Sequence, residues 1–386
     1  MKSNNILIIA GEASGDLHGA SLIRELKKLD GSLKIFGIGG NKMQDEGMDL
    51  IYHIDKMAFL GFVEVIKHLP FIKKVQRDLI DEVMKRKVNQ VVLIDYPGFN
   101  LNIAKKLKAL ESATADRLEL IYYITPQVWA WGKGRVDKIR ELFKKVLVVF
   151  PFEEKFFKEK NVDAVFVGHP LIQEINGYDF ISRNLLDKKF DLYPAKEILL
   201  ILPGSRKQEV KSIFPEAIKA ASRVAEELDM QVVVACSSNI DEKVFYELTD
   251  FKNFKVIKHQ TYDLLKHAKF GIVKSGTSTL EAGLLELPMV IVYKTSWLTY
   301  LIGKSLVKIK NFGMANIVLG EQVVPELIQN DANADNIYDS AKNILSDEDL
   351  LNRIKFKLRG IKKILGDKNA PENAAKIIYS LMMINK

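Results

Sequence analysis

The 386-residue sequence has one cysteine and no apolar run long enough to cross a membrane. Cys236 alone cannot form an internal disulfide, and its place in the apolar run QVVVAC indicates a buried strand residue. A membrane helix needs about 20 predominantly apolar residues, whereas the first apolar run ends at Gly11. We therefore expect a cytoplasmic chain, in a reducing compartment, without a signal peptide or a transmembrane anchor.

Metal-binding and nucleic-acid-binding patterns are also lacking. The six histidines form no H-E-x-x-H pair, and the one D-x-D match, Asp347 to Asp349, is expected to begin a helix, where acidic residues suit the helix dipole. No zinc-finger or basic-zipper pattern occurs. We therefore expect no metal, no cofactor and no nucleic-acid partner, although the net charge of +8 favours anionic partners such as phosphorylated metabolites or acidic lipid.

What the sequence does contain is an alternation of short β-branched or Leu-rich runs with stretches of helical period, which is typical of α/β folds. The expected strands are 5–10, 33–38, 91–95, 118–124, 146–150 and 164–167, and then 197–202, 231–236, 254–257, 270–274 and 289–293. A polar stretch after Gly168-His169-Pro170 separates the two series, and from Pro325 onward the pattern is helical throughout.

The pattern predicts two Rossmann-like, doubly wound domains and a helical C-terminal tail. We assign residues 1–169 to the first domain and 170–364 to the second, and we expect a helix at about 365–386 to pack back on the first. Doubly wound sheets bind ligands beyond the carboxyl ends of their strands, so functional residues are sought immediately after each strand.

Two such places lie in the first half. The segment GEASGDLHGA, which begins at Gly11, opens a helix after the first strand. Glu12, Ser14 or Asp16 could contact a ligand there, and the structural alternative is a tight turn with Asp16 capping the helix. Asp95 follows the run VVLI. It is either a turn residue or, if Asn100 caps the next helix, a partly desolvated carboxylate that can act as a general base.

Two further places lie in the second half, and both suit phosphate. In ILLILPGSR, glycine lets a phosphate approach the backbone, and Arg206 can bind it beside a helix N-terminus. The residues concerned are Gly204, Ser205 and Arg206. The structural alternative is a capped helix with a solvated arginine.

The second phosphate-compatible place is SGTSTLEA, where Ser275, Gly276 and Thr277 open a helix and Glu281 lies one turn later. A diphosphate could bind the amides and hydroxyls, and Glu281 could accept hydrogen bonds from a ribose diol. A capping box between Ser278 and Glu281 is the structural alternative. Together the four loops favour a nucleotide-sugar held across a cleft between the domains.

Seven motifs, taken in order and spacing, resemble lipid-A-disaccharide synthases over about residues 11–327. They are GEASGD, IDYPGFN, TPQVWAWGKGR, FPFE, VGHP, LPGSR and SGTSTLEA. The resemblance implies a GT-B fold with a cleft, an acceptor-binding first domain and a second domain that binds the UDP-sugar. It also implies inverting transfer from UDP-2,3-diacylglucosamine to 2,3-diacylglucosamine 1-phosphate, at the cytoplasmic face of the inner membrane. A homodimer is left open.

Carried over by motif, the resemblance makes Asp95 the base and Arg206 a diphosphate ligand. It places the nucleotide at Ser275, Gly276, Thr277 and Glu281, adds Asn316 near the donor, and gives the cleft Gln127, Trp129, Trp131, Lys133 and Arg135. Some relatives have a second acidic residue where this chain has Gly98, so a mechanism with two carboxylates is not expected. The alternatives are a UDP-N-acetylglucosamine 2-epimerase, another UDP-N-acetylglucosamine-type transferase, and a non-catalytic UDP-sugar sensor.

A membrane contact is expected in the segment AFLGFVEVIKHL. Its apolar residues cover more than one helical stripe, and Lys67, Lys73 and Lys74 lie close by, as in interfacial segments. The apolar residues are Phe59, Leu60, Phe62, Val63, Ile66 and Leu69. Packing against the sheet or a partner subunit is the alternative.

Overall fold

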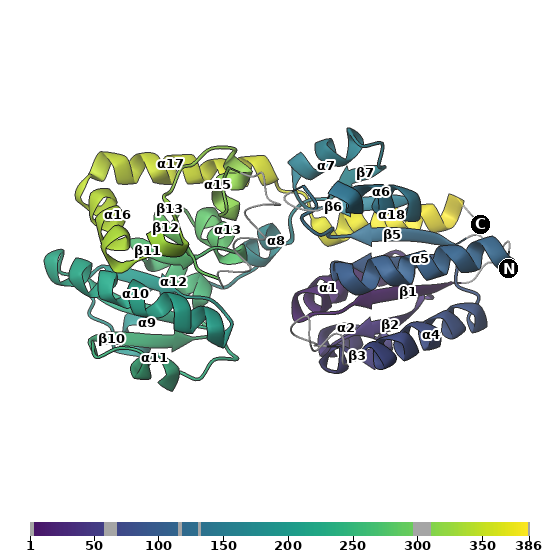
Figure 1. Cartoon of the computed structure of the whole chain (residues 1–386), viewed down its shortest axis with the longest axis horizontal. Coiled ribbons are helices and arrows are strands. Elements are labelled where there is room, and N and C mark those ends of the chain that lie inside the picture. Colours follow the sequence, from purple (N-terminus) through teal and green to yellow (C-terminus); the bar gives the residue numbers. More distant parts are fainter. Residues whose placement is uncertain (1–3, 58–67, 115–117, 130–132, 296–309, 385–386) are drawn as a thin grey trace. The chain divides into compact units, whose positions relative to one another are not determined.

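The structure is a computed structural model that describes residues 4–57, 68–114, 118–129, 133–295 and 310–384. The chain divides into two compact units, one formed by Met1–Gln173 with Asp367–Lys386 and the other by Glu174–Gly366. Both are α/β units built on a parallel sheet (Figure 1). The α/β class and the doubly wound topology predicted from the sequence are therefore confirmed.

The sheet of the first unit has seven parallel strands in the order β3-β2-β1-β4-β5-β6-β7. The central strands read as continuous apolar runs because helices cover both faces of a parallel sheet, and Ile6 to Ala10 are fully buried. The strands are β1 Asn5–Ala10, β2 Lys34–Gly39, β3 Asp49–His53, β4 Gln90–Ile94, β5 Glu119–Tyr123, β6 Lys145–Val148 and β7 Ala164–Phe166.

The helices of the first unit alternate with these strands along the chain. They are α1 Ala13–Leu29, α2 Asn41–Asp45, α4 Leu69–Lys85, α5 Pro97–Thr114, α6 Lys133–Leu142 and α7 Pro151–Lys158, with a short 3-10 helix at Ile54–Lys56. Helix α18, Ala370–Ile384, returns to this unit and packs against α1. The side-chain amide of Gln90 on β4 donates to the Ile378 carbonyl at 2.9 Å, which fixes α18 to the sheet.

The sheet of the second unit has six parallel strands in the order β10-β9-β8-β11-β12-β13. The strands are β8 Ile198–Leu202, β9 Gln231–Cys236, β10 Phe254–Lys258, β11 Phe270–Lys274, β12 Met289–Tyr293 and β13 Glu326–Ile328. The helices are α9 Arg183–Phe190, α10 Lys207–Glu227, α11 Lys243–Glu247, α12 Thr261–His267, α13 Thr277–Leu284, α15 Met314–Leu319, α16 Ala334–Ser346 and α17 Glu348–Leu365, with a 3-10 helix at Gln329–Asp331. Helix α8, Pro170–Asn176, contains the boundary between the units.

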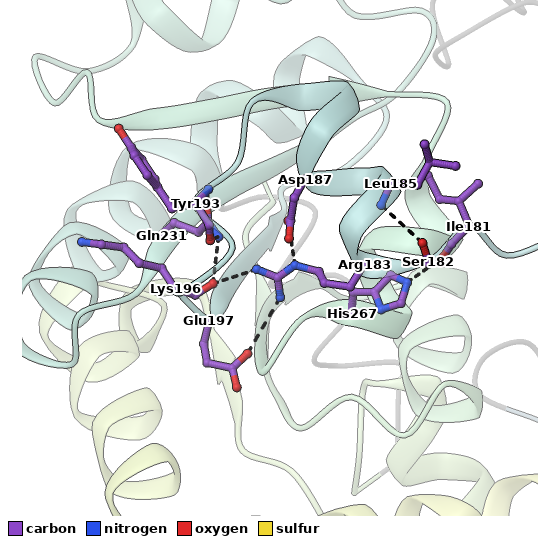
Figure 2. A network of polar contacts seen from close by, with 10 residues as sticks. All are labelled: Ile181, Ser182, Arg183, Leu185, Asp187, Tyr193, Lys196, Glu197, Gln231 and His267. Carbon is purple, nitrogen blue, oxygen red and sulfur yellow. Dashed lines mark hydrogen bonds and ion pairs between the residues drawn. The ribbon is translucent and has the colours of Figure 1, made fainter.

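A polar network fastens α9 and the segment after it to this second sheet (Figure 2). Arg183 donates to the Asp187 carboxylate at 2.7 Å and to the Lys196 carbonyl at 2.7 Å. Gln231 at the start of β9 accepts from the Tyr193 amide at 2.9 Å and donates to the same Lys196 carbonyl at 2.8 Å. These bonds fasten the segment after α9 to the start of β9.

Two strands were not expected from the sequence. The prediction that the chain is helical throughout from Pro325 is wrong at β13, Glu326–Ile328, which pairs with β12 at the sheet edge. Three residues are too few to show a period of two, and only the neighbouring strand makes them extended. Strand β3, Asp49–His53, was missed because it is also an edge strand and only partly apolar.

Candidate active site

The reversal of strand order gives each sheet a switch point, where ligands bind in folds of this kind. In the first unit the switch lies between β1 and β4, and in the second between β8 and β11. The four loops singled out in the sequence follow these four strands. Gly11 follows β1, Asp95 follows β4, Pro203 follows β8 and Ser275 follows β11.

A pocket of about 650 Å³ lies at the switch point of the second unit and brings the two phosphate-compatible loops together. It is lined by Tyr178, Leu202, Gly204, Ser205, Arg206, Glu209, Ala235, Ser237, His259, Thr261, Tyr262, Lys274, Gly276, Thr277, Ser278 and Glu281. Its volume is that of an ordinary small-molecule site. Of the predicted nucleotide residues, those of the LPGSR loop and Gly276, Thr277 and Glu281 line it, whereas Ser275 and Asn316 do not.

Glu209 organises the LPGSR loop. Its carboxylate accepts hydrogen bonds from the amides of Ser205 at 3.1 Å and Arg206 at 3.3 Å. Gly204 has a φ of 117°, and a Cβ at this position would lie 2.5 Å from a Glu209 carboxylate oxygen. Glycine is therefore required for the turn and for the approach of Glu209. The Arg206 side chain remains 69% exposed and can reach into the pocket.

The SGTSTLEA loop differs from its predicted hydrogen bonding. The Ser275 hydroxyl donates to the Phe312 carbonyl at 2.9 Å, so it supports the loop and cannot also bind a phosphate in this arrangement. The capping box is not formed, because α13 begins at Thr277 and the Ser278 hydroxyl donates back to the Lys274 carbonyl at 3.2 Å. The Thr279 amide donates to the Gly276 carbonyl at 3.1 Å, whereas the amides of Thr277 and Ser278, the first two of α13, precede any partner within the helix and are available to an anion.

Glu281 lies in a carboxylate-rich corner of the pocket. Burial, followed by the nearby negative charge of Glu174, raises the pKa of Glu281 to about 7. Tyr262 donates to Glu174 at 3.3 Å and packs edge-on against Tyr178, which donates to Asp263 at 2.5 Å. The corner offers hydrogen-bond acceptors and aromatic rings, which suit a nucleoside.

Asn316 has a structural role. It is fully buried, and its amide donates to the Val324 carbonyl at 2.9 Å and to Glu326 at 2.7 Å. Its oxygen accepts from the Val323 amide at 2.8 Å. These bonds use the whole side chain to hold the turn before β13, and Asn316 is not among the residues that line the pocket.

Asp95 is the central titratable group at the switch point of the first unit. Burial raises its pKa to about 6, the negative charge of Glu12 adds to this rise, and a hydrogen bond from the Tyr96 amide opposes it. The backbone of Asp95 and Tyr96 has φ of 44° and 45°, a strained conformation for residues other than glycine. A carboxylate with such a pKa is ionised near neutrality and basic enough to accept a proton.

The expected helix cap at Asn100 is wrong. Helix α5 begins at Pro97, and the buried Asn100 amide instead donates to the carbonyls of Ile94 at 3.1 Å and Asp95 at 2.7 Å. Asn100 therefore stabilises the strained turn that presents Asp95. The sequence also predicted that the Asp95 carboxylate is not used for capping. That prediction does not depend on which residue caps α5.

The GEASGD loop presents Glu12 and Ser14 on the surface, while Asp16 is buried. Asp16 does not cap its own helix. Its carboxylate accepts from the amides of Gly40 at 2.7 Å and Met43 at 3.0 Å, so it caps α2 and is not free for a ligand. A Cβ on Gly11 would lie 2.2 Å from the Tyr96 ring, so only glycine lets the loops after β1 and β4 meet.

The predicted cleft residues of the first unit are placed in part. Trp129 donates from its indole nitrogen to Glu153 at 3.0 Å, and Glu153 also accepts from the Phe150 amide at 3.2 Å. Burial raises the pKa of Glu153, which is 1% exposed, to about 7. Gln127 and Arg135 are exposed, and Lys133 is the first residue of α6. Trp131 lies outside the described residues.

Sequence reasoning missed Glu153, Glu209 and Lys274 as site-supporting residues. Glu153 ends the FPFE motif, Glu209 follows LPGSR by three residues and Lys274 directly precedes SGTSTLEA. The contacts Glu153–Trp129 and Lys274–Glu209 join residues that are distant in the sequence, so only the fold reveals them. The membrane-contact residues Phe59, Leu60, Phe62, Val63 and Ile66 lie outside the described residues. Leu69, the first residue of α4, is 43% exposed.

Within residues 4–57, 68–114, 118–129, 133–295 and 310–384, no helix combines the length and apolar character that crossing a bilayer requires. The same part of the chain contains no group of three or more His, Cys, Asp or Glu residues that could hold a metal ion.

Comparison with known proteins identifies the family. The profile described as lipid-A-disaccharide synthetase matches residues 6–378. Relatives named lipid-A-disaccharide synthase include those of Geobacter sulfurreducens, 37% identical over 98% of both chains, and Syntrophus aciditrophicus, 38% identical over 100% of this chain and 99% of the relative. A relative of the same name from Coxiella burnetii is 35% identical over 99% of this chain and 100% of its own.

Solved structures share the fold at low sequence identity. A UDP-GlcNAc 2-epimerase from Neisseria meningitidis bound to UDP-GlcNAc superposes with a TM-score of 0.65 at 13% identity, covering 99% of this chain and 100% of that one. The calicheamicin glycosyltransferase CalG4 gives a TM-score of 0.60 at 16% identity over 100% of both chains. These likenesses show the GT-B fold alone, whereas the profile and the full-length relatives show more: the chain belongs to the lipid-A-disaccharide synthetase family.

Proposed function

We propose that this chain is an inverting glycosyltransferase that joins UDP-2,3-diacylglucosamine to 2,3-diacylglucosamine 1-phosphate. The products are lipid A disaccharide 1-phosphate and UDP. The observation that carries the proposal is the pocket at the switch point of the second unit, where the LPGSR and SGTSTLEA loops meet. The full-length relatives that bear the name lipid-A-disaccharide synthase support the choice of substrates.

The UDP moiety of the donor occupies that pocket in our proposal. The diphosphate lies between the loop Gly204-Ser205-Arg206 and the first amides of α13, because helix N-termini and guanidinium groups stabilise anions. The ribose diol donates to Glu281. UDP then leaves with its new negative charge opposite Arg206, which stabilises the transition state as well as the product.

Asp95 is the general base in this proposal. It removes the proton from the primary hydroxyl of the acceptor while that oxygen attacks the anomeric carbon of the donor, and the bond between that carbon and the diphosphate breaks. One displacement inverts the anomeric centre without a covalent intermediate. A positioned base contributes about 100- to 10,000-fold to such a step, and holding both sugars in line contributes the larger part.

The first unit is proposed to bind the lipid acceptor, through Glu12, Ser14, Gln127, Trp129, Lys133 and Arg135 near the carboxyl ends of β1 and β5. An acceptor with acyl chains must be met at a bilayer, so the enzyme is proposed to act as a peripheral protein on the cytoplasmic face of the inner membrane. The apolar segment at 58–69 is proposed as the contact, with Leu69 at its described end.

The test is the dependence of UDP release on the acceptor. Purified protein is incubated with UDP-2,3-diacylglucosamine, with and without 2,3-diacylglucosamine 1-phosphate, and UDP and sugar epimers are measured by chromatography. Transfer predicts UDP only when the acceptor is present. A donor epimerised without any acceptor would establish an isomerase instead, and UDP bound without turnover would establish a sensor.

A further inference from the structure

Lys274 is a cation of the pocket that no motif identifies. It is the last residue of β11, and its side chain is 19% exposed. Its ammonium lies 3.0 Å from Glu209, and a Cβ on Gly276 would lie 3.5 Å from the same nitrogen. Lys274 is therefore located between the LPGSR loop, which Glu209 holds, and the start of α13.

Lys274 and Arg206 share a single carboxylate partner, Glu209, so this group of three side chains carries one net positive charge. Glu209 faces Lys274 at 3.0 Å and the Arg206 guanidinium at 3.7 Å. Among the described residues that line the pocket, Arg206 and Lys274 are the two permanent cations. An ammonium has three donors, so the ion pair with Glu209 leaves others for a second anion.

We propose that Lys274 binds the diphosphate of the donor nucleotide together with Arg206. This inference rests on the proposed function and adds a catalytic residue to it. Glu209 orients the ammonium, because its carboxylate is itself fixed by the Ser205 and Arg206 amides. The mostly buried Lys274 provides a fixed charge, and the exposed Arg206 a mobile one. Lys274 thereby stabilises both the bound diphosphate and the departing UDP.

The test is the affinity for UDP and for uridine, measured by calorimetry on the whole 386-residue chain. In Lys274→Met we expect the dissociation constant of UDP to rise about 10- to 100-fold, as for a lost hydrogen bond between charged groups, while that of uridine stays within about twofold. Lys274→Arg should retain most of the affinity for UDP. Equal weakening of both ligands, or of neither, would overturn the proposal.

A matched control pairs with the same helix, α10, from the end of the neighbouring strand. Lys294 follows β12 and pairs with Glu216 on α10 at 3.8 Å, much as Lys274 ends β11 and pairs with Glu209 on α10, but Lys294 is outside the pocket lining. Lys294→Met should leave both dissociation constants unchanged. If Lys294→Met lost as much UDP affinity as Lys274→Met, the effect would come from the net charge of the unit, and the proposal would be overturned.

A second comparison separates contact with phosphate from support of Glu209. Lys274→Met is made in a Glu209→Gln background, so that the loss of Lys274 leaves no unpaired carboxylate at position 209. The comparison can therefore be made even if Lys274→Met alone does not fold. A persistent loss of UDP affinity supports direct contact, and its disappearance shows that Lys274 acts only on Glu209. If the parent protein makes disaccharide and Lys274→Met binds UDP equally well, this inference alone fails. If the parent makes none, the proposed function fails.

Discussion

Activity should fall on the acid side of neutrality as Asp95 gains a proton, and Glu12 should set where the fall occurs. The pKa of Asp95 is raised from 3.8 to about 6, first by burial and then by the charge of Glu12. A base with a pKa of about 6 is about nine-tenths ionised at pH 7 and about one-tenth ionised at pH 5. The proposed mechanism therefore predicts about a tenfold loss of activity between these two pH values.

The assay is kcat/KM for the acceptor at saturating donor, measured between pH 4.5 and 8. Saturation keeps Glu281 engaged with the nucleotide, so that its own titration does not distort the acid limb. Glu12→Gln removes a like charge beside Asp95 and should move the limb to lower pH. Asp163→Asn, which changes a carboxylate directly before β7 and so at the opposite end of the sheet, should leave it in place.

Two results would refute this reasoning. An ordinary carboxyl with a pKa near 3.9 would remain more than about nine-tenths ionised at pH 5, so a flat profile between pH 5 and 7 would show that no shifted base acts. Turnover retained in Asp95→Asn would show that Asp95 is a turn residue. We expect that variant to lose at least about 100-fold in turnover while UDP affinity changes little.

Two further predictions concern the phosphate loop and the buried glutamate. Arg206→Ala should weaken UDP binding and turnover together, about 10- to 100-fold. EDTA should have little effect on activity, because protein cations neutralise the diphosphate. Activity that is lost in EDTA and restored by magnesium would contradict this prediction. Burial raises the pKa of Glu153 to about 7, so the stability that its proton contributes is complete below about pH 4.5 and is lost as the pH rises through about 7. Glu153→Gln should therefore flatten the fall in the free energy of unfolding between pH 5 and 8, by on the order of 3 kcal/mol, and an unchanged slope in urea titrations would refute the assignment.

The strands that carry the site could be predicted because a parallel sheet imposes a local signal. Asn5–Ala10 and Phe270–Lys274 are apolar runs closed by glycine or serine, and they appear in the structure with the predicted bounds. Once strands and helices alternate, the switch-point rule points to the residues after each strand. Asp95 and Gly204 were singled out as candidates in this way, without knowledge of any contact.

Hydrogen-bond partners could not be predicted, because they come from distant parts of the chain. Asp16 caps a helix whose first residues lie more than twenty positions later. Ser275 donates to a carbonyl beyond the next strand, at Phe312. Local rules assign such side chains to their own helix, and tertiary contacts override that preference. Lys274 was missed for the same reason, since Glu209, which positions it, belongs to another motif.

The most direct test of the central claim is the structure of the product. The protein is incubated with UDP-2,3-diacylglucosamine labelled with carbon-13 in the sugar and with unlabelled 2,3-diacylglucosamine 1-phosphate, and the lipid product is analysed by mass spectrometry and by NMR of its anomeric carbon. Our account predicts a tetra-acyl disaccharide phosphate, formed in equal amount with UDP, in which the labelled anomeric centre is inverted relative to the donor. A labelled monosaccharide, an epimerised donor or a disaccharide with retained configuration would contradict it.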